Sequence, residues 1–415
     1  MTAASRRARA SLALVLALGV AILALVALDG LLPAPSRESA APTPAPGRVR
    51  QGDLQAALDD ATTALLARDR SAWDAALPAT GAARRAMGAL YRRLAPLPWT
   101  SLRLVAEPVS GRPGRFFVGA VGELGHAGPD DRIFARRVVD AELRDGRPVL
   151  RDDVTPAELR GQGVMAFDRP VVVRRHGLVV IAERRRRAGA EALADAGGPA
   201  RRRLRLLGIR GGAPVVVWYY SSRAQLLRSL GEDPGEVRIR FFSHAPLRLG
   251  ERPTRTRDIG VLGPALAGRE SWAPRMLAHE LTHAYTARWF EGSRHAPTLL
   301  AEGLATAVEG GRSFTPLRRD LAAATSAFPL EKALRARSLW KGNPVAKVRL
   351  AYLEGASLVL YVLDRWGLAA LKRFVTAVSD SDLSRGGLDT ATRRSLGIGW
   401  AELRSGWADF VQTLP

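Results

Sequence analysis

The sequence of 415 residues contains no cysteine. Disulfide bonds, catalysis by a thiolate and zinc sites with cysteine ligands are therefore excluded. A free thiol is a liability in an oxidising compartment, so the absence of cysteine is compatible with export from the cytoplasm without establishing it. Histidine is also scarce, with six in the whole chain.

Acidic residues are few relative to basic ones. The chain has 40 Asp and Glu against 62 Lys and Arg, which gives a net charge of +22. Such a balance raises nucleic acid and anionic surfaces as partners. However, the sequence has no zinc-finger spacing, no aromatic RNA-binding signature and no basic heptad region, and arginine is spread from end to end. We expect no nucleic-acid partner, and binding to an anionic polymer remains a minor alternative.

The N-terminus carries an apolar run, Leu12–Leu28, that follows Arg6, Arg7 and Arg9. At about 17 residues it is long for a signal peptide and short for a membrane-spanning helix. No small-x-small cleavage site follows it, so we predict an uncleaved signal anchor in residues 1–32, with a cleaved and secreted form as the alternative. The basic flank predicts a single-pass protein of the cell membrane with its C-terminal bulk outside the cytoplasm.

After a linker rich in proline and alanine (residues 33–48), residues 49–160 predict a small α+β domain. Helical patterns come first and strand-like runs follow, an order that resembles the nuclear transport factor 2-like fold without a supporting motif. No titratable cluster there indicates catalysis, so we expect substrate presentation, partner binding or spacing. The predicted helices are Asp53–Arg68, one beginning at Ser71, and Gly81–Leu94; the predicted strands are Ser101–Pro108, Arg115–Leu124, Arg132–Leu143 and Pro148–Val154.

A second pattern of strands begins near Phe167. The run Ile259–Leu262 directly precedes the helix that carries the main motif, and we propose it as the sheet edge that binds an extended peptide through its backbone. A helix from Arg184 to Leu207 separates the earlier strands from the later ones. The predicted strands are Pro170–Val173, Gly177–Ala182, Ala213–Tyr220, Val237–Ser243 and Ile259–Leu262.

The strongest chemical signal is the motif His279-Glu280-Leu281-Thr282-His283. Two imidazoles four residues apart on a helix lie on one face and can reach one metal ion. Glu302 follows nineteen residues after His283, on a second predicted helix over 297–308. Two histidines and a carboxylate leave a fourth zinc position open, which is typical of a catalytic site.

The context of this motif makes a chance match less plausible. From the His and Glu content, an H-E-x-x-H pattern arises by chance in roughly one such sequence in two hundred. Here the motif lies on a predicted helix over 273–290 with Pro274 in its first turn, and an apolar stripe runs beside the histidines. The remaining histidines do not fit the ligand spacing and are interpreted as turn, strand-flanking or rim residues; they are His126, His176, His244 and His295.

These residues, together with Ala301-Glu302-Gly303-Leu304-Ala305, resemble the gluzincin branch of the zincin metallopeptidases, in particular the peptidase MA-like families. The resemblance covers residues 168–415 and includes a Tyr-bearing helix at 350–357 and a C-terminal helical signature at 396–403. It implies a zincin-like domain with a mostly helical C-terminal half. It also implies that His279, His283 and Glu302 ligate Zn²⁺ and that Glu280 is the catalytic base.

The expected reaction is hydrolysis of a peptide bond in a peptide or protein substrate. Zinc lowers the pKa of its bound water, and Glu280 takes the proton and later delivers it to the leaving amine. Tyr352 is the candidate donor to the developing oxyanion. An aromatic residue that merely packs on a helix face is an equal alternative for Tyr352.

One position departs from the resemblance. Thermolysin-type enzymes place an aspartate four residues after the ligand glutamate, where this chain has Thr306. The orientation of the first histidine must then come from a hydroxyl, a backbone carbonyl or another acid. Glu309 lies on the same side of the helix and is interpreted as a residue behind the ligands or on the surface.

Taken together, the sequence predicts an α+β protein with an N-terminal transmembrane helix, a small helix-plus-antiparallel-sheet domain and a zincin-like metallopeptidase domain. The predicted function is that of a membrane-anchored, extracytoplasmic zinc metallopeptidase. The alternative is a binding or assembly protein of the cell envelope that retains a zinc site with little or no turnover.

Overall fold

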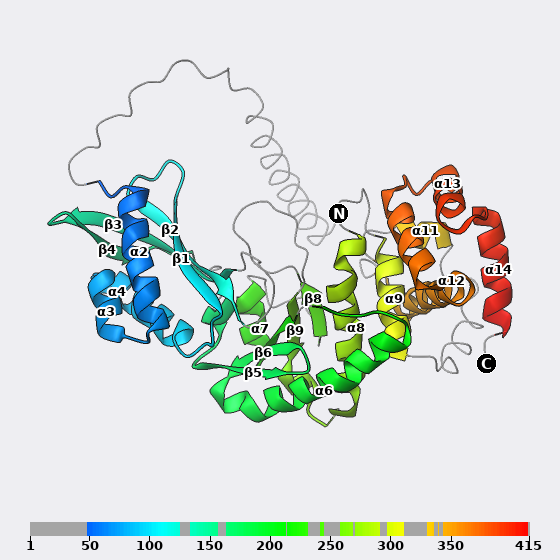
Figure 1. Cartoon of the computed structure of the whole chain (residues 1–415), viewed down its shortest axis with the longest axis horizontal. Helices are drawn as coiled ribbons and strands as arrows, with labels where there is room; N and C mark the ends of the chain where they lie inside the picture. The colour runs from blue at the N-terminus through cyan, green and yellow to red at the C-terminus, as the bar shows by residue number, and fades with distance from the viewer. Residues whose placement is uncertain are drawn as a thin grey trace, which may run out of the picture. The chain divides into compact units, whose positions relative to one another are not determined.

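The computed structural model gives an α+β fold (Figure 1). The chain divides into two units, residues 1–46 and 47–415, and all described residues lie in the second. His126, His295, the signal segment 1–32 and almost all of the linker lie outside the described residues. The described ranges are 48–124, 133–156, 163–212, 214–230, 241–244, 258–268, 270–290, 297–310, 330–335, 339 and 343–413.

The predicted fold class needs one correction, which concerns the transmembrane helix. Within the described residues no helix is both long enough and apolar enough to cross a membrane. The longest of them, α12 (Val345–Asp380), is interrupted by charged side chains such as Asp364 and Arg365, whose burial in hydrocarbon is costly. The predicted transmembrane helix is therefore not supported by the described residues. The location outside the cytoplasm, inferred from the same N-terminal segment, stays a prediction.

The described part of the N-terminal region contains three helices and an antiparallel sheet of order β1-β2-β3-β4. α2 forms because Leu54, Leu58 and Leu65 recur at helical spacing and become buried. The second helix begins earlier than predicted, because Asp69 rather than Ser71 caps it and accepts a hydrogen bond from the Ala72 amide at 2.9 Å. The elements are α2 (Gln51–Leu66), α3 (Arg70–Ala76), α4 (Gly81–Leu94), β1 (Ser101–Pro108), β2 (Arg115–Glu123), β3 (Ile133–Arg144) and β4 (Arg147–Asp153).

A second, mixed sheet follows, with the order β5-β6-β7-β9-β8. β5 and β6 form a hairpin whose two turn residues, His176 and Gly177, both have positive φ (50° and 71°), as a tight two-residue turn requires. β6, β7 and β9 are parallel, and α6 (Arg187–Leu206) is the crossover between β6 and β7. The strands are β5 (Pro170–Arg175), β6 (Leu178–Glu183), β7 (Val215–Tyr220), β8 (Phe241–His244) and β9 (Asp258–Leu262). α7 (Arg223–Leu230) follows β7.

The strand proposed as the peptide-binding edge is not an edge. β9, which contains Ile259–Leu262, lies between β7 and β8 and is hydrogen-bonded on both sides. The chain segment before it returns antiparallel as β8 and occupies the outer position, and β8 contacts the helix α8 (Ala273–Thr286). The prediction for Ile259–Leu262 was therefore wrong, and among the described strands β8 is the outermost one beside the motif helix.

Both faces of the second sheet are covered by apolar side chains. Val180 and Val217 belong to one core, shared with α6 and α8. Ile181 and Trp218, one residue further along each strand, belong to the core of the N-terminal region. The ring of Trp218 lies 6.1 Å from that of Phe134 in β3. The N-terminal region therefore buries one face of the sheet that supports the motif helix.

The C-terminal half is mostly helical, as predicted. α9 and α12 approach each other so closely that a Cβ at Gly303 would lie 2.3 Å from the carbonyl carbon of Gly355. α12 breaks at Gly367, where φ is 77°. The remaining helices are α9 (Thr298–Gly310), α11 (Leu330–Arg335), α13 (Arg385–Leu396) and α14 (Trp400–Thr413).

Candidate metal centre

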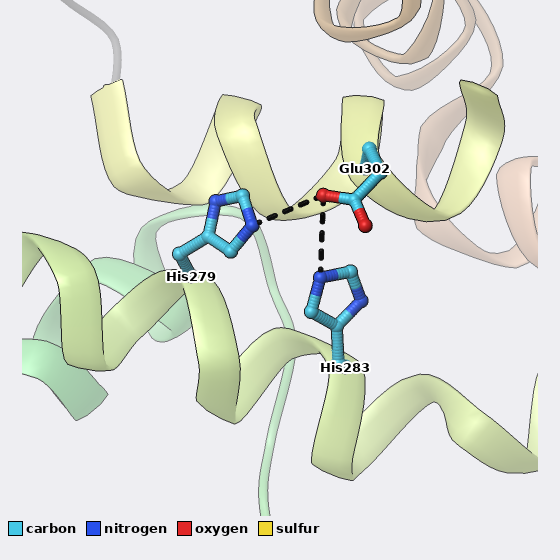
Figure 2. A group of neighbouring side chains, drawn as sticks. All are labelled: His279, His283 and Glu302. Atoms are coloured by element: carbon cyan, nitrogen blue, oxygen red, sulfur yellow. Dashed lines mark hydrogen bonds and ion pairs between the residues drawn. The ribbon is translucent and has the colours of Figure 1, made fainter. Parts of the chain in front are cut away.

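The motif helix α8 buries the residues on either side of its two histidines. Pro274 occupies its first turn, where a missing amide hydrogen costs nothing. Leu277 and Leu281 are fully buried in the core between α8 and the sheet. This packing fixes the rotation of the helix, so His279 and His283 project together from the side that faces α9 (Figure 2).

Glu302 is brought to these histidines by α9. The close contact of Gly303 with Gly355 holds α9 against α12, and α9 also contacts α8. Figure 2 shows the Glu302 carboxylate pointing back from α9 to both imidazoles. Its Oε2 lies 3.2 Å from His279 Nε2 and 3.6 Å from His283 Nε2.

The spacing of the three donor atoms fits one metal ion. One ligand atom from each of His279, His283 and Glu302 lies within 4.8 Å of the others. Two donors about 2.1 Å from a tetrahedral metal are about 3.4 Å apart, which agrees with both histidine–carboxylate distances. The cluster can therefore hold a metal ion.

A second carboxylate stands behind the cluster. Glu309 Oε2 lies 3.2 Å from His279 Nδ1, on the opposite side of the ring from Glu302. Thr306, the position where thermolysin-type enzymes have aspartate, has a buried Oγ1 that makes no hydrogen bond within the described residues. The side chain that contacts the second ring nitrogen of His279 is instead Glu309. The signal was present in the spacing, since Glu302 and Glu309 are seven residues apart and lie on one helix face.

The charges in the cluster stabilise one another. Burial opposes protonation of His279, but hydrogen bonds to Glu302 and Glu309 raise its pKa to about 10. Burial likewise disfavours ionised Glu302, yet His279 and His283 hold its pKa well below the usual range. A metal cation can replace the imidazolium charge, because it neutralises the same carboxylate at the same place.

Glu280 is buried beside the ligands, with 5% of its surface exposed. Burial is the main cause that raises its pKa, while the charges of His279 and His283 partly counteract it. A carboxylate beside a metal cluster becomes a stronger base when its pKa is raised, which suits it to accept and return a proton.

Tyr352 reaches the same place from α12. Its ring centroid lies 6.5 Å from that of His279, with an angle of 25° between the planes. The predicted site residues Glu280, His279, His283, Glu302 and Tyr352 are thus gathered from three helices. His295, interpreted as a rim residue, lies outside the described residues.

No protein-family model matches this chain, and no curated protein is similar to it in sequence. The resemblance to gluzincins therefore rests on the motif residues themselves. Membership of that group, the identity of the metal and the activity are proposals.

Proposed function

We propose that this protein is a gluzincin-like, zinc-dependent metallopeptidase. The observation that carries the proposal is the cluster of His279, His283 and Glu302 with the buried Glu280 beside it. Many proteins hold metals through histidine and carboxylate groups, but a neighbouring buried carboxylate outside the ligand set is the additional group that hydrolysis requires.

Zinc is the metal we propose, because two imidazoles and one carboxylate form a donor set typical of catalytic zinc with one position left for water or substrate. The carboxylate of Glu309 supports this assignment. It accepts the Nδ1 proton of His279 and so directs Nε2 toward the metal.

When bound, zinc would supply Lewis-acid polarisation of the scissile carbonyl and lower the pKa of water toward neutrality. Glu280 accepts the proton of the attacking water as the carbon–oxygen bond forms. It then delivers that proton to the amine nitrogen as the carbon–nitrogen bond breaks. Burial raises the pKa of Glu280 above its ordinary value, which makes its carboxylate a stronger base for the first of these transfers.

Two further elements fit a peptide substrate. The edge strand β8 contacts α8 and has an outer side on which an extended peptide can pair through its backbone. Tyr352, close to His279, is the proposed hydrogen-bond donor to the oxyanion.

The second candidate is a binding or assembly protein that retains the zinc site with little turnover. Its main argument was the missing aspartate at Thr306. Because Glu309 hydrogen-bonds His279, the position at Thr306 no longer argues against catalysis. The two candidates differ in whether a Glu280-dependent cleavage exists.

The test compares zinc-loaded wild type with Glu280→Gln on a broad peptide library. We expect the wild type to cleave and the variant to keep its zinc while losing about 10²–10⁴-fold in rate. Glu270→Gln is the matched control. Glu270 is exposed and lies shortly before α8, so this variant is expected to cleave like wild type. Equal cleavage by wild type and Glu280→Gln would refute the proposed base. Cleavage by neither, with zinc present in both, would favour the binding protein.

A further inference from the structure

A cavity of about 700 Å³ lies in the N-terminal region, away from every residue of the metal cluster. It is open to solvent and is lined by α3, α4, the loop between them and the β3–β4 hairpin. Its floor is apolar, since Leu77, Met87 and Val149 are all buried there. A cavity of this size accommodates a small organic molecule.

Four arginines line this cavity, one each from α3, α4, β3 and β4: Arg70, Arg84, Arg144 and Arg147. Three of them are held in place through the inner nitrogen Nε. Arg70 donates from Nε to Asp74 at 2.8 Å, Arg84 to the Ala79 carbonyl at 2.9 Å, and Arg144 to Glu142 at 2.6 Å.

These bonds use only one end of each guanidinium. Among the described residues, the terminal nitrogens of Arg70, Arg84 and Arg144 donate no hydrogen bond to another residue. Arg70 is fixed further by its position over the Tyr91 ring, 5.1 Å from the centroid. A guanidinium held by Nε keeps two outer N–H groups that can bind a carboxylate or phosphate in a bidentate manner.

The charge of the lining also favours an anion. Asp74 is neutralised by Arg70, while Arg84 and Arg147 have no carboxylate partner in the described part of the chain. Four guanidiniums and two carboxylates, Asp74 and Asp145, leave the lining with a surplus of positive charge.

We propose that this cavity binds a small organic anion, with a carboxylate or phosphate head held by Arg84 and Arg147 and an apolar part on Leu77, Met87 and Val149. The site is separate from the metal centre, because no residue belongs to both. The N-terminal region then has a ligand-binding role of its own, and zinc binding is expected to be the same whether or not the cavity is occupied.

Isothermal titration calorimetry of the full chain with hexyl phosphate and with hexanoate tests the proposal, and the two arms distinguish a phosphate from a carboxylate head. Hexanol is the neutral control. We expect saturable binding of at least one anion at one site per chain and none of hexanol. The double variant Arg84→Gln, Arg147→Gln should weaken binding by about tenfold or more.

The matched control is Arg85→Gln, Arg92→Gln, which removes the same charge from exposed α4 positions that do not line the cavity. It is expected to change the affinity by less than about twofold, since solvent-exposed charges that do not contact the ligand are screened. Thermal unfolding of each variant shows that the protein is folded. The proposal is overturned if neither anion binds saturably, if hexanol binds equally well, or if both double variants weaken binding to the same extent. Zinc content and peptide cleavage should be unchanged in all of these variants.

Discussion

The N-terminal region and the metal centre place their charged side chains in opposite ways. The N-terminal cavity has an apolar interior, and its arginines lie at the margin. At the metal centre His279 and Glu280 are themselves buried, with 8% and 5% of their surfaces exposed. Burying charge is costly unless the groups pair, and in the centre His279 pairs with carboxylates on both sides. The two regions therefore use charge differently. The metal centre buries charged groups that must be paired, whereas the N-terminal cavity keeps its arginines at the margin of an apolar interior.

The same contrast exists between two buried carboxylates. Glu302 is paired with two imidazoles, and its pKa is lowered. Glu354 in α12 has a buried Oε2 without a partner in the described structure, and burial alone raises its pKa to about 7. Pairing rather than burial therefore decides which state each carboxyl adopts.

The largest effect on stability is expected at the sheet face that joins the two regions. Trp218 is 3% exposed, contacts Phe134 and Phe167, and donates from its indole nitrogen to Asp258 at 2.8 Å. Trp218→Ala should lower the free energy of unfolding by about 3–5 kcal/mol, because it opens a cavity between the two regions.

Chemical denaturation of Trp218→Ala beside Trp272→Ala measures this. Trp272 is 56% exposed, so its removal should change stability by only about 0.5 kcal/mol. Similar losses in both variants would mean that the N-terminal region does not share a core with the second sheet.

A smaller effect is expected where the metal centre is supported from behind. Glu309→Gln keeps the shape of the side chain but removes the charge that accepts the His279 Nδ1 proton. Metal affinity should fall about 10- to 100-fold, as measured by competition with a chelator.

A carboxylate at the neighbouring position provides the complementary test. Position 306 lies one turn after Glu302 on the same face of α9, and its hydroxyl has no hydrogen-bond partner in the described part of the chain. Adding Thr306→Asp to Glu309→Gln should recover part of the lost affinity. Unchanged affinity in Glu309→Gln alone would show that this contact does not orient the ligand.

The smallest effect concerns the unpaired carboxyl. The pKa of Glu354 is about 7 in the folded protein, against 4.5 as the ordinary value, so the folded state holds a proton that the unfolded state releases between these pH values. The free energy of unfolding should therefore fall as pH rises from about 4.5 to 7, by roughly 1–2 kcal/mol from this group once the full value of about 3 kcal/mol is reduced for partial solvent screening. Glu354→Gln should remove that fall.

Denaturation of wild type and Glu354→Gln at pH 5 and pH 8 checks the sign. The variant should gain relative stability at pH 8. A pH-independent difference between the two proteins would mean that Glu354 is ionised throughout this range.

What the sequence predicted well was local. The periodic apolar residues around His279 define a helix, and the four-residue spacing places both histidines on one face whatever the rest of the fold does. Glu302 was also predictable, because it lies inside a second segment whose apolar residues recur at helical spacing.

What the sequence could not predict depends on contacts between distant segments. The outer position of β8 follows from the path of the chain before β9, which no periodicity encodes. The sharing of Trp218 with the N-terminal core was hidden because a strand that is buried on both faces reads as one continuous apolar run. Glu309 was visible on the correct helix face, but its distance to His279 depends on how α9 packs against α8.

The central claim is that His279, His283 and Glu302 bind one metal ion, and its most direct test is the metal content of the purified protein by elemental mass spectrometry. We expect about one zinc per chain in the wild type, with loss in both His279→Ala and His283→Ala. His176→Asn, in the β5–β6 turn where asparagine tolerates positive φ, serves as the histidine control and should keep its zinc. Full zinc content in both His279→Ala and His283→Ala would contradict the assignment.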